Sequence, residues 1–408
     1  MTGRMSRGAL SLLPYFIIPG LSAVTPLLVY PMMTLRHGAA GFTAVAAGMA
    51  VGLTIAAVCE LGWGVLGPQR VARSDPRTHQ DLLRSSLATK GTALLIGIPL
   101  AVLLTAFVVH DHHISAMVTA AGCALTALTP NWYLIGLNRP LRILFTDTLP
   151  KIATNVAVAG ALFLGAPLVV YGVGAIITSM IPLAGLMLLE RRSLLPRRKD
   201  FVDGFGVIRS QGTLTIGRAV TVTYTSLPVA LTTTFAPSSA ALFAATDRIL
   251  RMGLTVIAAI PSRFQSYLGV SDADLRRIRI RHALLVNAAL GISAGVVFFF
   301  ATPWAMEIFF TGTISSNISL NLVMAGIASL VCMSRGYGLC IVAKGLAHRT
   351  LWFTGTSAVV CLVLIMTLTP PLGALGTGLA ILIGEAAGLI VQMVLVHRSV
   401  DHSEFEEN

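Results

Sequence analysis

Long runs of apolar residues, separated by short polar connections, dominate the chain. A helix that crosses the hydrocarbon core of a bilayer, about 30 Å thick, requires roughly 20 mostly apolar residues. The pattern predicts twelve such helices, over residues 9–34, 41–66, 91–109, 115–137, 143–166, 168–189, 212–235, 239–261, 283–303, 318–343, 351–368 and 373–396. The expected fold is therefore an all-α integral membrane protein with twelve transmembrane helices.

Composition excludes a water-soluble fold. Of the 408 residues, 55% are hydrophobic and only 11% are charged, whereas soluble domains contain about 25% charged residues. The five cysteines lie within apolar runs and show no CxxC spacing, so neither a disulfide framework nor a zinc site is expected.

The net charge of +12 is concentrated in alternate connections between the apolar runs. These connections contain Arg70, Arg73, Arg77, Arg84 and Lys90, then Arg191, Arg192, Arg197, Arg198 and Lys199, then Arg263, Arg276, Arg277, Arg279 and Arg281. Cytoplasmic loops of membrane proteins carry the lysine and arginine excess, so both termini are expected on the cytoplasmic side. We interpret the basic clusters as topology determinants that contact anionic lipid, with specific binding as the alternative. No nucleic-acid partner is expected.

The two halves of the chain resemble each other. The fourth predicted helix exits through GLNRPLRILFT (136–146) and the tenth through GLAHRTLWFT (345–354). This similarity predicts two six-helix lobes, residues 1–200 and 201–400, related by a pseudo-two-fold axis along the membrane normal, with a substrate path between them. Residues 401–408 are expected to form a short cytoplasmic tail.

Several ionisable residues lie inside the apolar runs, where a charge is costly and normally faces the protein interior or a watery cavity. Asp247, Arg248 and Arg251 share one side of the eighth predicted helix. We interpret them, with Arg218 on the seventh helix and Arg335 on the tenth, as lining a cationic substrate cavity. The alternatives are an internal ion pair plus one cation that hold helices together and, for Arg218, a side chain that reaches the lipid headgroups.

Carboxylates inside the membrane are candidates for ion or proton coupling. Glu60, Asp247 and Glu385 are the candidates, because a carboxyl group in apolar surroundings could take up and release a proton. For Glu385, between Gly384 and Gly388, the alternative is a neutral hydrogen-bonded acid at a glycine-lined helix contact.

Asp147 and Lys151 are spaced i and i+4 on the fifth helix and are expected to form a structural ion pair, a candidate for the lobe interface. His110 to His113 fall in one short turn, which rarely supplies convergent metal ligands, so no metal site is expected. No P-loop pattern occurs, and we expect no cofactor and no catalytic residue.

Several short stretches resemble those of a known family. They are Arg36-His37-Gly38, Glu60-Leu61-Gly62-Trp63-Gly64, Asn131-Trp132-Tyr133-Leu134-Ile135-Gly136, and Ala241 to Arg248 followed by Arg251. These stretches resemble bacterial polysaccharide flippases, of the O-antigen type, in the multidrug/oligosaccharidyl-lipid/polysaccharide (MOP) exporter superfamily.

The resemblance implies a MATE-like fold of two six-helix lobes, working by alternating access in the bacterial cytoplasmic membrane. It implies an anionic substrate, an undecaprenyl-pyrophosphate-linked oligosaccharide, moved from the inner to the outer leaflet, with membrane lipids and glycan polymerases or glycosyltransferases as partners. The chain lacks the two extra helices of the peptidoglycan-precursor branch, so the glycan stays open.

Two other functions are compatible with parts of this pattern. A cation-coupled multidrug exporter of the same superfamily would favour acids in the cavity. The membrane-interior residues instead show a slight cationic excess: Arg218, Arg248, Arg251, Arg335 and Lys151 against Glu60, Asp147, Asp247 and Glu385. A membrane-embedded glycosyl- or acyltransferase would require catalytic residues in sizeable outer loops, and the outer loops here are short.

Overall fold

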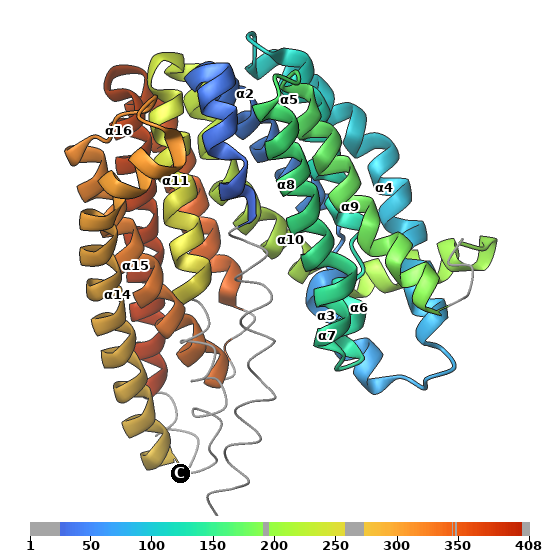
Figure 1. Ribbon diagram of the computed structural model, residues 1–408. Coiled ribbons are helices and arrows are strands. Elements are labelled where there is room, and N and C mark those ends of the chain that lie inside the picture. Colours follow the sequence, from blue (N-terminus) through green and yellow to red (C-terminus); the bar gives the residue numbers. More distant parts are fainter. Residues whose placement is uncertain (1–24, 191–195, 258–272, 345, 347–348, 402–408) are drawn as a thin grey trace, which may run out of the picture. The chain divides into compact units, whose positions relative to one another are not determined.

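The computed structural model describes residues 25–190, 196–257, 273–344, 346 and 349–401. Within these ranges every regular element is a helix (Figure 1). The elements are η1 (Thr25–Leu28), α2 (Tyr30–Cys59), α3 (Trp63–Arg73), α4 (His79–Val108), α5 (His113–Ala124), η2 (Leu125–Leu128), α6 (Asn131–Gly136), α7 (Pro140–Ile143), η3 (Leu144–Thr148), α8 (Leu149–Phe163), α9 (Val169–Glu190), α10 (Arg198–Phe235), α11 (Pro237–Ile257), α14 (Ala273–Phe310), α15 (Ile318–Ala343) and α16 (Thr350–Asp401). The predicted all-helical class is confirmed.

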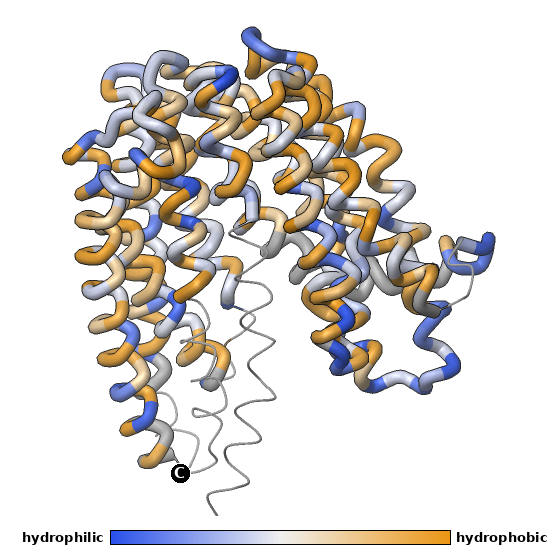
Figure 2. The backbone as a smooth tube through the Cα atoms, viewed as in Figure 1, coloured by the Kyte–Doolittle hydropathy of each residue, from blue (hydrophilic) through white to orange (hydrophobic). Residues whose placement is uncertain are grey.

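Seven helical segments of the described chain are long and apolar enough to cross a membrane. They are Tyr30–Arg73, His79–Val108, His113–Gly136, Val169–Leu188, Ile278–Phe310, Ile318–Val342 and Thr350–Arg398. Figure 2 shows hydrophobic residues along most of α4 and a hydrophilic connection between α3 and α4. The protein is therefore a multi-pass membrane protein. Helix α11 is not among the seven segments and carries three charges in its middle.

The chain divides into two compact units, Met1–Thr233 (unit 1) and Thr234–Asn408 (unit 2). The division falls near the end of α10, whereas the sequence analysis placed it after residue 200 and so assigned all but the start of this helix to the second lobe. The pseudo-two-fold relation between lobes stays a prediction. The start of the first predicted helix, residues 9–24, and nearly all of the expected tail lie outside the described residues.

Close packing of small residues organises unit 1. Helix α5 packs against α2, α4 and α9 (Figure 1). Gly48 and Gly52 of α2 lie directly against the backbone of Ala116 and Ala120 in α5. Small residues at such contacts let helix backbones approach closely, which is the main source of helix association in a membrane. A second core, around Trp63, joins α3, α4, α6, α7 and α9.

Left-handed residues break the predicted helices of unit 1. Gly38 has φ 66° and separates the first two predicted helices, as expected. Leu61 and Gly62 have φ 53° and 77°, so the predicted helix 41–66 ends at Cys59 and α3 begins at Trp63. The predicted helix is therefore interrupted at the ELGWG motif, residues 60–64. The apolar run alone did not predict this turn, which uses the freedom of Gly62 to adopt a positive φ.

Helix α4 begins at His79, well before the predicted start at residue 91. Arg84 and Lys90, which we assigned to a basic connection, are therefore helical and only 7% and 1% exposed. Contact of these two side chains with anionic lipid, part of our interpretation of the basic clusters, is therefore wrong, and the role of the clusters in setting topology stays a prediction. The physical reason is the run of small and hydroxyl residues between them, against which Gly204 of α10 packs at Ser85 and Thr89.

The described part of unit 2 contains α11 and three longer helices. Helices α14, α15 and α16 lie side by side, and α11 packs against all three (Figure 1). Gly373, with φ 58°, breaks α16 just after Pro370 and Pro371, which confirms the predicted break between 368 and 373. The two halves of α16 fold against each other, since a Cβ on Gly384 would lie 2.8 Å from Cys361 Cβ.

Candidate functional site

Asp247 is the buried centre of the charged stretch on α11. Its side chain is 3% exposed, and its Oδ2 lies 2.7 Å from Nε of Arg251, one helical turn further on. The Arg251 side chain is 35% exposed, so it extends from the buried carboxylate toward accessible space. Arg248 follows Asp247 directly and is half-buried; three residues apart, Arg248 and Arg251 are neighbours on the helix surface.

Two further helices bring charges to this region. Arg335 of α15 donates from Nη1 to the carbonyl oxygen of Leu254 in the last turn of α11, at 2.9 Å. Arg335 interacts electrostatically with Glu385 of α16. The thiol of Cys361 lies within electrostatic range of both Glu385 and Arg251. The structure thus brings five sequence-predicted residues of unit 2 into one region, here called the unit 2 charge cluster: Asp247, Arg248, Arg251, Arg335 and Glu385.

The unit 2 charge cluster has an excess of positive charge, with three guanidinium groups and two carboxylates. Glu385 is buried at 8% exposure, next to the glycine contact at Gly384. The coupling roles of Glu385 and Asp247 stay predictions. A guanidinium presents a planar fork of donors that matches phosphate and carboxylate oxygens. Chemically, the cluster is suited to hold an anion next to an internal ion pair.

Arg218, the fourth predicted cavity arginine, lies in α10 of unit 1, and its side chain falls outside the described part of the chain. One cavity lined by all four arginines therefore stays a prediction. Glu60 lies in the turn between α2 and α3, half-buried, with its carboxylate directly against Gly64. Its coupling role also stays a prediction.

Unit 1 contains a polar group around Asp147. Lys151 Nζ lies 2.9 Å from Oδ1 of Asp147, which confirms the predicted i, i+4 ion pair. Asn131 donates from Nδ2 to the other oxygen, Oδ2, at 2.8 Å. Asp147 lies in η3, one turn of π-helix, a feature found often at functional sites. The proposed place of this pair at a lobe interface stays a prediction.

Lys90 was assigned to a basic connection, and the sequence analysis did not predict its aromatic partner. Its ammonium group lies 5.6 Å from the centre of the Trp132 ring, within the range of a cation–π interaction. Trp132 packs on Trp63 at 5.3 Å between ring centres, and Trp63 donates from Nε1 to Thr89 Oγ1 at 3.2 Å. The available signal was the run of small residues that precedes Lys90, which is typical of a packed helix face.

We expect Asp147→Ala to lower the free energy of unfolding by about 3 kcal/mol, because it leaves the Lys151 ammonium and the Asn131 amide without a shared acceptor. Thermal or denaturant unfolding of the purified protein measures the change. The variant Asp147→Asn with Lys151→Gln removes both charges together and should lose clearly less stability. Equal losses in the two variants would contradict an ion pair that matters for stability.

Among the described residues, no three histidine, cysteine, aspartate or glutamate side chains are grouped as metal ligands.

A family model described as polysaccharide biosynthesis protein matches residues 12–263, more than half of the chain. The chain belongs to the polysaccharide biosynthesis protein family. The match includes α11 with Asp247, Arg248 and Arg251, and it confirms the resemblance drawn from the short motifs. No curated protein matches this polysaccharide biosynthesis family member in sequence.

Solved transporters of the MOP superfamily share the fold of this polysaccharide biosynthesis protein. An inward-facing multidrug resistance MATE family transporter has a TM-score of 0.71 at 15% identity, covering 96% of this chain and 99% of its own. The eukaryotic MATE transporter AtDTX14 has a TM-score of 0.56 at 14% identity, covering 97% and 95%. A MOP superfamily transporter from Pyrococcus furiosus, described as having a binding pocket of reverse polarity that suggests a different function, has a TM-score of 0.54 at 13% identity, covering 94% and 95%.

At these identities the neighbours establish the fold, and the family establishes the class. The protein is a membrane transporter of the MOP superfamily with a MATE-like fold, and its family and neighbours are transporters rather than enzymes.

Proposed function

We propose that the protein is an alternating-access flippase that moves an undecaprenyl-pyrophosphate-linked oligosaccharide from the inner to the outer leaflet of the bacterial cytoplasmic membrane. The observation that carries the proposal is the positive excess of the unit 2 charge cluster in a member of a polysaccharide biosynthesis family. Pyrophosphate carries negative charge that is costly in bare hydrocarbon, and Arg248 and Arg251 would stabilise it there.

The membrane potential supplies a direction for this transport. Moving a negative charge outward across an inside-negative membrane releases about 2.3 kcal/mol per charge per 100 mV.

We propose twelve crossings with both termini cytoplasmic. Each half of α16 and each of α10 and α11 would form one crossing, and the glycan polymerase or glycosyltransferases would dock on the cytoplasmic side.

A cation-coupled multidrug exporter is the second candidate, favoured by the buried carboxyl group of Glu385 and by the MATE neighbours. If Glu385 carries a coupling proton, Glu385→Gln should abolish the pH dependence of transport, because an amide cannot bind and release that proton. Arg335 and Cys361 lie within electrostatic range of Glu385 and stay unchanged in this variant. The matched control is Glu307→Gln, an exposed acid of α14. Unchanged pH dependence in Glu385→Gln argues against a proton role.

The proposed substrate class can be tested with two lipid-linked oligosaccharides that carry the same glycan, one on a pyrophosphate and one on a neutral linkage. In proteoliposomes, we expect the pyrophosphate-linked form to be transported at least about tenfold faster, the equivalent of one charge-assisted hydrogen bond. Equal rates for both lipids would contradict selection by charge. Transport of small organic cations instead of either lipid would favour the exporter.

A further inference from the structure

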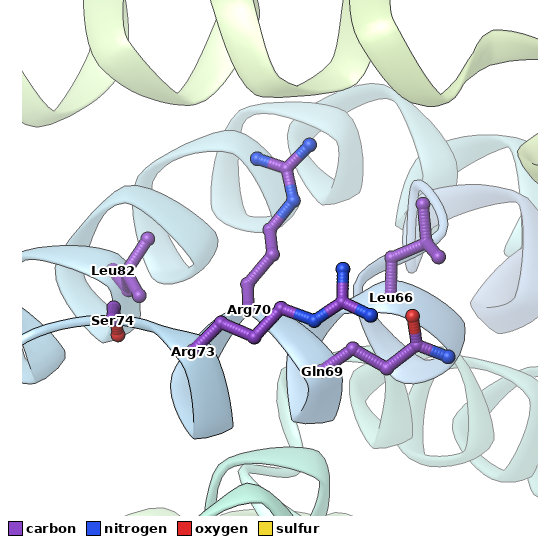
Figure 3. A pocket seen from close by; sticks show the side chains of 6 residues that line it. All are labelled: Leu66, Gln69, Arg70, Arg73, Ser74 and Leu82. Carbon is purple, nitrogen blue, oxygen red and sulfur yellow. The ribbon is translucent and has the colours of Figure 1, made fainter.

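A pocket of about 460 Å³ lies in unit 1 between α3 and the start of α4 (Figure 3). Its lining residues are Leu66, Gln69, Arg70, Arg73, Ser74 and Leu82. Two of these six described residues are arginines and none is acidic. Every one of them belongs to unit 1, and none is a member of the unit 2 charge cluster. This pocket is here called the α3–α4 pocket.

The register of α3 directs the arginines to one side. Leu66, Arg70 and Arg73 follow the i, i+4, i+7 spacing that places side chains on one helix face. Figure 3 shows the side chains of Arg70 and Leu66 projecting from α3, with the Arg73 side chain running from its own position toward Leu66. An apolar side chain and two guanidinium groups thus share one wall of the pocket.

The turn that closes the α3–α4 pocket is held by its own hydrogen bonds. Thr78 donates from its backbone N–H to the carbonyl oxygen of Asp75 at 2.9 Å, and Ser74 Oγ donates to the carbonyl oxygen of Val71 at 3.2 Å. Nε2 of the His79 ring lies 3.2 Å from the carbonyl oxygen of Ser74. These hydrogen bonds hold the backbone at Ser74, and the backbone N–H of Leu82 donates to the carbonyl oxygen of Thr78 at 3.0 Å.

The carboxylates nearest in the chain have partners outside the pocket lining. Asp75 accepts the backbone N–H of Arg77 at 2.8 Å. Asp81 lies 3.2 Å from Lys199 Nζ and 3.8 Å from Arg84 Nη1. Neither carboxylate belongs to the pocket lining.

The position of the α3–α4 pocket along the chain indicates what occupies it. Helix α3 follows the apolar helix α2 across the break at Gly62 and leads into the hydrophilic connection to α4 (Figure 2). The pocket therefore lies where a membrane-spanning segment meets the polar boundary. Leu66 and Leu82 suit the glycerol and upper acyl carbons of a lipid, and the arginines suit its phosphate.

We propose that the α3–α4 pocket binds the phosphate group of an anionic phospholipid through Arg70 and Arg73. Soluble phosphate compounds offer the same charge but no apolar part for Leu66 and Leu82. This lipid site goes beyond the proposed transport function and does not depend on it.

The test measures binding of fluorescent phosphatidylglycerol to the purified full-length protein in a neutral detergent. We expect Arg70→Gln with Arg73→Gln to weaken binding about tenfold or more, as expected for lost charge-assisted hydrogen bonds. Arg73→Gln alone, at an exposed position, should fold normally and weaken binding to a smaller extent. The matched control is Arg77→Gln, an exposed arginine of the same connection outside the pocket lining, which should bind as the unaltered protein does.

Three outcomes overturn the proposal. Equal weakening by Arg77→Gln would mean that lipid binds to general surface charge. Equal binding of phosphatidylcholine would remove the role of net lipid charge. Full competition by millimolar inorganic phosphate would assign the pocket to a soluble phosphate. Thermal unfolding of each variant, compared with the unaltered protein, separates lost binding from lost folding.

Discussion

Replacing Arg248 and Arg251 together by alanine is expected to reduce transport of the lipid-linked oligosaccharide about 100-fold or more, because each charge-assisted hydrogen bond to an anion contributes about 1.5–3 kcal/mol. Both arginines lie in the middle of α11, and Arg251 extends from the buried Asp247 toward accessible space. The rate of appearance of the glycan on the outer face of proteoliposomes measures the effect.

The same change also leaves a carboxylate buried, so folding and transport must be separated. Without Arg251, the Asp247 side chain loses its ion-pair partner at 3% exposure, and breaking a buried pair costs about 3–5 kcal/mol. Adding Asp247→Asn removes the stranded charge and should recover stability but not transport. Arg281→Ala, at an exposed position of α14, is the matched control and should leave transport intact. Full transport by the triple variant would show that the cluster only holds helices together.

Gly384→Leu is expected to destabilise the protein by about 3 kcal/mol, since it inserts a large side chain into a closed contact. A Cβ at this position would lie 2.8 Å from Cys361 Cβ and 3.0 Å from the Ser357 carbonyl oxygen. Neither neighbour can rotate away, so the two halves of α16 must separate. Glu385, the next residue, would move with them, and we expect transport to fall as well.

Gly355→Leu is the matched control for this prediction. Gly355 lies in the first half of the same helix, and nothing lies within 4 Å of a Cβ built there. The same substitution should leave the unfolding temperature unchanged or slightly raised, because leucine favours a helix over glycine. If the two leucine variants unfold at the same temperature, the glycine contact in α16 is not important for stability.

Much of the fold followed from apolar runs, which report burial in lipid directly. Runs such as 318–343 coincide with a helix in the structure, because the bilayer sets their length. Local breaks were harder to predict. Leu61 adopts a left-handed conformation that leucine rarely prefers, so nothing in its apolar character marked the end of α2.

Contacts within one helix could be predicted from the sequence, whereas contacts between helices that are distant in the sequence could not. Asp247 and Arg251 form their pair through i, i+4 spacing, which a sequence displays directly. Lys90 depends on Trp132, more than forty positions away, and on neighbours that only the fold brings near. Lys90 lies beside a basic connection, so we did not predict that it is buried. The small residues that precede it are nevertheless typical of a packed helix face.

We propose that this chain exposes an anionic lipid-linked oligosaccharide on the outer face of a membrane. The direct measurement follows a labelled undecaprenyl-pyrophosphate oligosaccharide in proteoliposomes with an outer-face probe, with and without the protein, and with and without an inside-negative potential. We predict exposure that requires the protein and accelerates with the potential. No protein-dependent exposure, over a range of glycans and imposed potentials, would contradict lipid flipping and favour small-molecule efflux.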